Sequence, residues 1–175
     1  MKVLAKYASL LLVIVSVAFS QNDGAGNTGL AFLKLGVTSR SISLGEAVVS
    51  STNDASATDY NPAALFNGSK MNLVFMHNEQ ILGVRTEFFG AKMKGEKFAF
   101  GLSLNNTSID KIEVREIPGE PLGEFTAQNF AFGLSVGYKV NNMLSIGATG
   151  KFIYEKIYVD NASGFAFDIG GLYVK

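Results

Sequence analysis

From residue 70 onward, large apolar residues alternate with small or polar ones. This period of two is typical of β-strands whose two faces meet different surroundings. The alternation is clearest in residues 129–138, where Phe, Leu, Val or Tyr occupies every second position and Ala, Gly or Ser most of the positions between. We predict six strands, at residues 70–77, 84–93, 97–105, 129–140, 143–158 and 164–174. The pattern therefore predicts an all-β, antiparallel fold.

The connections between these strands are of two kinds. Residues 94–96 and 141–142 form tight turns, whereas residues 106–128 predict a long loop. Short turns at one end and longer loops at the other are typical of an outer-membrane β-barrel, which is apolar outside and small or polar inside. Tyr138, Tyr154 and Tyr173 lie near strand ends, where such barrels carry aromatic girdles. A soluble β-sandwich or lipocalin-like barrel with the apolar face inward is the alternative, since periodicity does not say which face is inside.

The first twenty residues have the pattern of a secretory signal peptide. Lys2 and Lys6 precede an apolar run at residues 8–19, and Ala18 and Ser20 frame a cleavage site. The run is shorter than the roughly 20 residues of a membrane-spanning helix. We therefore predict a signal peptide at residues 1–20 and export of the mature chain.

Composition excludes several classes of protein. The chain has 175 residues, of which 47% are hydrophobic and 17% charged, with 15 basic and 15 acidic side chains. A nucleic-acid-binding protein would carry a basic excess, and a disulfide-stapled module would carry cysteines, of which there are none. The 19 glycines fit a sheet with one face of small residues, facing a lumen.

Residues 21–69 differ from the strands that follow. They are rich in Gly, Ala, Ser, Thr and Asn, with an apolar stretch at residues 30–37 and helical turns expected at residues 54–60 and 62–66. We predict that this segment folds into the barrel lumen as a hatch or plug, with residues 70–175 forming the first barrel strands. A periplasmic tail is the alternative.

The N-terminal part of the chain contains three recognisable runs: AGNTGLAFLKLGV at residues 25–37, LGEA at 44–47, and DASA at 54–57 leading into YNPA at 60–63. These runs resemble the opening of the PorV/PorQ family, a branch of the FadL-like outer-membrane barrels. The resemblance implies that Asn61, Pro62 and Ala63 form a hatch motif. The family usually has glycine where Glu46 stands.

The resemblance also implies a function. It indicates a bacterial outer-membrane protein that takes part in type IX protein secretion, with outer-membrane lipid and secretion-system proteins or secreted cargo as partners. A FadL-like channel for uptake of a hydrophobic small molecule and a soluble periplasmic β-domain are the alternatives. Six strands are fewer than the about eight of the smallest closed barrel, so we expect an N-terminal portion of a longer protein. A barrel closed by several chains, or two further strands at residues 109–117, would also supply the missing strands.

Few residues could carry chemistry. Lys151, Glu155 and Asp168 are predicted to be lumen-facing charges that pair with each other or with the plug, a role in ligand passage being the alternative. GAGNTG at residues 24–29 fits the dinucleotide fingerprint, but no preceding strand accompanies it, so we expect no cofactor. His77 is the only histidine, which argues against a metal site or a catalytic triad. We predict no enzymatic activity, and the loop at residues 112–121 is a candidate partner contact.

Overall fold

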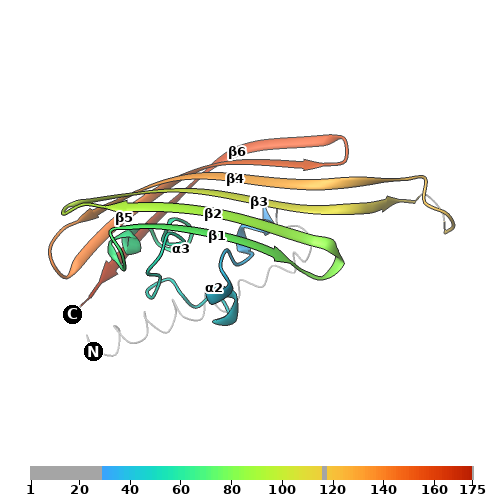
Figure 1. Cartoon of the computed structure of the whole chain (residues 1–175). Coiled ribbons are helices and arrows are strands. Elements are labelled where there is room, and N and C mark those ends of the chain that lie inside the picture. Colours follow the sequence, from blue (N-terminus) through green and yellow to red (C-terminus); the bar gives the residue numbers. More distant parts are fainter. Residues whose placement is uncertain (1–28, 116–117, 175) are drawn as a thin grey trace, which may run out of the picture. The chain divides into compact units, whose positions relative to one another are not determined.

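The computed structural model describes residues 29–115 and 118–174, and its main feature is one antiparallel sheet of six strands (Figure 1). The predicted signal peptide lies outside the described residues. The sheet belongs to a compact unit whose described part begins at Phe32. The strands are β1 (Met71–Glu79), β2 (Val84–Lys94), β3 (Phe98–Val114), β4 (Gly123–Lys139), β5 (Leu144–Ile157) and β6 (Asp160–Tyr173).

The strands pair in chain order, β1 to β6, and each neighbouring pair is antiparallel. Within the described residues, β1 and β6 are the two edges, so the sheet is open. The all-β class, the number of strands and their antiparallel pairing are confirmed. Residues 109–114 extend β3 and do not form the two additional strands considered above.

The predicted long loop at residues 106–128 is wrong. β3 continues to Val114 and β4 begins at Gly123, so only residues 115–122 connect them. The register shifts between Ile109 and Ile112, and Lys111 has a φ of 56°. A bulge of this kind breaks the period of two and hides a strand extension from a pattern search. The connection expected at residues 159–163 is also shorter, because β6 already begins at Asp160. The expected arrangement, with short turns at one end of the sheet and longer loops at the other, is therefore not observed: the end that holds the β3–β4 connection also holds the short β5–β6 turn.

The two faces of the sheet differ as the alternation predicts. On the face that we call the outer face, one register row crosses all six strands with large apolar side chains. Its members are Phe75, Phe89, Leu104, Phe132, Phe152 and Phe165. The opposite, inner face carries mainly Gly, Ala, Ser, Thr and Asn, with Met76, Phe88 and Ile153 as larger exceptions.

Residues 32–69, which we call the covering segment, pack on the inner face. They hold most of the short helix η1 (Ala31–Lys34), α2 (Ser39–Ser43), α3 (Ala57–Tyr60) and η2 (Pro62–Phe66), and Figure 1 shows α2 and α3 on one side of the sheet. The helical turns predicted at residues 54–60 and 62–66 are confirmed by α3 and η2. Helix α2 was missed, although Thr38 and Ser41 form a capping box at its start. One further short helix, η3 (Ile81–Gly83), lies between β1 and β2.

The hydrophobic core lies between the covering segment and the inner face. Phe32 packs with Ala131 and Ile153, and Val37 packs with Met76 and Phe88. A third cluster joins the two helices α3 and η2 to β3 and β6. No helix in the described ranges is both long and apolar enough to cross a membrane.

Candidate functional site

Helix η2 lies directly on the backbone of β5 and β6. A β-carbon built on Gly147 would lie 2.5 Å from the carbonyl carbon of Pro62 and 2.7 Å from the nitrogen of Ala63. One built on Gly170 would collide with the side chain of Asn61. Glycine at these two strand positions therefore allows the close approach of a second backbone.

Asn61 joins three parts of the chain at this contact. Its Oδ1 accepts a hydrogen bond from the Ala63 N–H at 3.1 Å and so caps η2, which begins at Pro62. Its Nδ2 donates to the carbonyls of Val49 at 3.0 Å and Gly171 at 3.3 Å. The Asn61-Pro62-Ala63 motif singled out in the sequence is thus the point where the covering segment is fastened to β6.

Hydroxyl and amide groups of the sheet bind the backbone of the covering segment at further points. Ser145 Oγ donates to the Ala63 carbonyl at 3.0 Å, and the amide N–H of Ala55 donates to Asn72 Oδ1 at 2.8 Å. Small polar residues on the inner face thus satisfy backbone groups that burial would otherwise leave unpaired.

A buried ion cluster fixes α3 on the sheet. Lys151 Nζ lies 3.1 Å from Asp59 Oδ1 and 2.9 Å from Asp168 Oδ2. The side chains of Lys151 and Asp59 are only 9% and 12% exposed, and that of Asp168 is 40% exposed. Burial raises the pKa of the Asp59 carboxyl, and the Lys151 ammonium opposes this rise. Because Lys151 and Asp59 are largely removed from water, the loss of any one partner would leave a buried charge unpaired and would destabilise the packing of α3 on the sheet.

The structure brings together two of the three charged side chains that were predicted to face the lumen and that lie on the inner face of the sheet. Lys151 and Asp168 pair, whereas Glu155, half-buried on the same face of β5, takes part in none of the ion pairs seen among the described residues. Asp59 was missed, because a partner 92 residues away in the sequence leaves no local sign.

Two lysines of β2 bind the carboxyl end of η2 and the residues around it. The Lys92 ammonium, whose residue is 4% exposed, donates to the carbonyls of Asn53 and Asn67. Lys94 Nζ donates to the carbonyls of Phe66 and Gly68, each at 2.6 Å. Cations suit this position because the last carbonyls of a helix lack partners within it. Sequence reasoning missed both lysines.

Tyr60 connects α3 to the residues around α2. Its hydroxyl accepts from the Val37 N–H at 3.1 Å, lies 2.7 Å from Ser41 Oγ and donates to the Glu46 carboxylate. Glu46 has a φ of 66°, in the left-handed region that favours glycine. Glu46 therefore keeps a backbone conformation suited to glycine, and its side chain accepts a hydrogen bond from Tyr60.

Tyr60 makes the covering segment sensitive to alkaline pH. Burial and the Glu46 hydrogen bond raise the pKa of Tyr60 to about 12, whereas an unfolded tyrosine ionises near pH 10. The neutral phenol favours the packed segment, so its stabilisation is complete below pH 10 and is lost as pH rises through 12. We expect proteolysis of the segment to accelerate over this range. The Tyr60→Phe variant should lack this transition and Tyr138→Phe should retain it; an identical profile in both variants would contradict the prediction.

The residues considered for catalysis or metal binding are not brought together. His77 lies on the outer face, with its Nδ1 3.5 Å from Glu87 Oε1, and both side chains are half exposed. In residues 29–115 and 118–174, no three His, Asp or Glu side chains gather as a metal site would require. The residues that form the fingerprint-like GAGNTG run lie, except for Gly29, outside the described part of the chain.

The outer face is apolar, and its side chains are exposed in the described part of the chain. Phe75, Phe165, Phe167 and Ile169 are 74%, 77%, 80% and 90% exposed. The next row on the outer face, beside the row that contains Phe75, Phe89 and Leu104, is polar on the first three strands. Its residues there are His77 on β1, Glu87 on β2 and Asn106 on β3. The apolar side chains thus form a band across the strands, bounded by polar residues at the end that holds the β3–β4 turn.

A comparison with models of protein families identifies the family of this chain. The family model described as "Uncharacterised protein family (UPF0164)" matches residues 12–165, which is most of the sequence. A search of curated proteins found no match.

Proposed function

We propose that this chain, which belongs to the uncharacterised protein family UPF0164, forms part of a β-barrel in a bacterial outer membrane. The observation that carries the proposal is a sheet covered on one face by its own N-terminal segment and uncovered on its large apolar face. Monomeric soluble proteins rarely expose continuous apolar patches larger than a few hundred Å². In a lipid bilayer, this apolar outer face needs no protein to cover it.

Details of the outer face fit this proposal. A barrel surface has an apolar band with aromatic residues at its borders. Tyr138 and Tyr173 lie at or next to the ends of β4 and β6, and the ring of Tyr138 packs against Phe98 at 5.3 Å between centroids. Tyr154, the third tyrosine considered, lies three residues before the end of β5.

Closure of the barrel requires more strands than the six described. An open edge in lipid leaves unpaired backbone groups, each at a cost of several kcal/mol. In the proposed barrel, further strands pair with β1 and β6. Either a longer chain or additional chains would supply them.

Within such a barrel the covering segment acts as the hatch, because it lies on the face that would line the lumen. The resemblance to PorV/PorQ proteins supports a role in type IX protein secretion, with secretion proteins or exported cargo as partners. Uptake of a hydrophobic molecule is the rival. Co-purification of the tagged protein with secretion components would support secretion, and loss of uptake without loss of secretion in a deletion strain would refute it.

Ile169→Arg tests the membrane assignment. In water, a substitution at a side chain that is 90% exposed changes stability by less than about 0.5 kcal/mol. On a lipid-facing strand, an arginine near the middle of the bilayer costs about 2–4 kcal/mol. We therefore expect the variant to accumulate poorly in the outer-membrane fraction and to unfold at lower denaturant concentration.

Asn161→Arg is the matched control, since Asn161 is exposed on the same strand beyond the apolar band. It should behave like the unmodified protein. Full stability of Ile169→Arg, together with recovery of the protein in the soluble periplasm, would refute the membrane assignment.

A further inference from the structure

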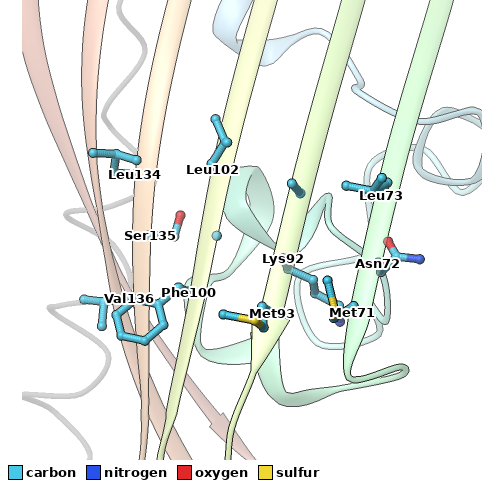
Figure 2. Close-up of a pocket in the computed structure, with 12 residues that line it drawn as sticks. Met71, Asn72, Leu73, Lys92, Met93, Phe100, Leu102, Leu134, Ser135 and Val136 are labelled. Atoms are coloured by element: carbon cyan, nitrogen blue, oxygen red, sulfur yellow. The ribbon is translucent and has the colours of Figure 1, made fainter.

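A groove on the outer face crosses β1 to β4. It has a volume of about 610 Å³, and its walls are the apolar side chains that Figure 2 labels on these strands. Those side chains are Met71, Leu73, Met93, Phe100, Leu102, Leu134 and Val136. Ala91 also lines the groove, and its short side chain lies between Leu73 and Leu102 in one register row. The groove is therefore an indentation in the apolar band, lined by apolar side chains as an extended apolar chain would require.

A second hollow, of about 320 Å³, shares Met93 and Phe100 with this groove. It lies at the turn between β2 and β3 and is lined by Lys70, Lys94 and Lys97 as well as Glu96. Lys94 already binds two carbonyls of the covering segment. Lys70 and Lys97 are exposed and take part in no ion pair seen within the described ranges.

Charge differs between the two ends of the sheet. The end that holds the β2–β3 and β4–β5 turns carries Lys70, Lys94, Lys97 and Lys139 against Glu96. The opposite end carries more carboxylates than cations. Its described carboxylates outside the inner face are Glu79, Glu87, Asp110, Glu113, Glu120 and Glu124, and its cations are Arg85, Lys111, Arg115 and Lys156. An anionic headgroup is thus favoured at the first end, which is where the apolar groove opens.

We propose that the two hollows together form a binding site for one phospholipid with an anionic headgroup. Its acyl chain lies in the apolar groove, and its phosphate contacts Lys70 and Lys97. This inference rests on the proposed membrane location. A phospholipid with an anionic headgroup uses both the apolar groove and its basic end.

The absence of tryptophan from the chain permits a direct test. Leu134→Trp places one fluorophore on the wall of the groove, and Phe167→Trp places another in the same register row on β6, outside it. The full chain is reconstituted in vesicles of phosphatidylcholine with brominated phosphatidylglycerol, and then with brominated phosphatidylcholine. Bromine quenches tryptophan only on close approach, so quenching reports the lipid beside each site.

In the Leu134→Trp variant, we expect brominated phosphatidylglycerol to bind beside the fluorophore at least about fivefold better than brominated phosphatidylcholine, since one lysine near an anionic headgroup contributes about this factor. No preference is expected in the Phe167→Trp variant. In the Leu134→Trp background, Lys70→Gln combined with Lys97→Gln should remove the preference and Glu96→Gln should raise it. Lys156→Gln, at the opposite end, should leave it unchanged.

The outcomes separate this inference from the proposed function. Equal quenching by both lipids in both variants would leave the membrane assignment intact and overturn the lipid site. Quenching in Phe167→Trp but none in Leu134→Trp would mean that protein covers the groove and would also overturn it. Absence of quenching in both variants would refute the membrane location itself.

Discussion

Replacement of Lys151 by methionine is expected to release the covering segment from the sheet. The substitution removes the only cation of the ion cluster and leaves Asp59 and Asp168 close together, with Asp59 almost fully buried. Loss of one partner from a buried ion pair costs about 3–5 kcal/mol. We expect the lower end, about 3 kcal/mol, because Asp168 retains 40% exposure. Local opening of the segment should then be favoured by roughly a hundredfold.

Hydrogen exchange of the amides in residues 57–66 measures this opening. Lys156→Met is the matched control, since Lys156 lies on the same strand but is exposed. Adding Asp59→Asn to Lys151→Met removes one of the two uncompensated carboxylates and should restore part of the protection. Unchanged exchange in Lys151→Met would show that the cluster does not hold the segment.

Gly147→Val is expected to push η2 off the sheet without altering any charge. The new side chain would meet the backbone of Pro62 and Ala63, which cannot turn away as a flexible side chain can. Overpacking of this kind typically costs about 1–3 kcal/mol, and we expect at least the upper value. The displacement also strains the hydrogen bonds that Asn61 makes to Val49 and Gly171.

Limited proteolysis within residues 61–69 detects the displaced segment. Gly150→Val tests whether the effect belongs to the position, because Gly150 lies on the same strand and a β-carbon there would be 3.7 Å from the Phe167 ring, an ordinary contact. It should resist proteolysis as the unmodified chain does. Equal cleavage of the two variants would point to a general effect of valine on β5 and would contradict a specific contact with η2.

Alternation along the chain was sufficient to predict the two faces of the sheet. The prediction succeeds for residues 129–138 of β4, where large and small side chains alternate. The residues of β5 that pair with them alternate between the two faces in the same register. The prediction fails where the period breaks, as at Lys111, because a bulge turns the following residues to the opposite face. Residues 106–108 are all polar and residues 112–114 follow the bulge, so residues 106–114 were assigned to a loop although they belong to β3.

The candidate site was predictable only in part. The Asn-Pro-Ala motif was singled out only by the resemblance to the PorV/PorQ family; in the structure Asn61 caps η2 and Pro62 begins it, and both roles are local. The roles of Asp59, Lys92 and Lys94 depend on contacts across 25 to 92 residues. Nothing near these residues in the sequence indicates such partners, so their roles became clear only once the strands were placed.

The contact between Asn61 and Gly171 spans 110 residues, which sets an order of events during folding. The covering segment leaves the ribosome first, yet the surface on which Pro62 and Ala63 rest exists only after β5 and β6 have paired. Contacts so distant in sequence form slowly, and the chain exposes apolar surface in the meantime. The core cluster of Leu65, which includes Leu172 of β6, therefore remains incomplete until the last described strand is in place. Over that interval, a holding chaperone would protect the chain from aggregation.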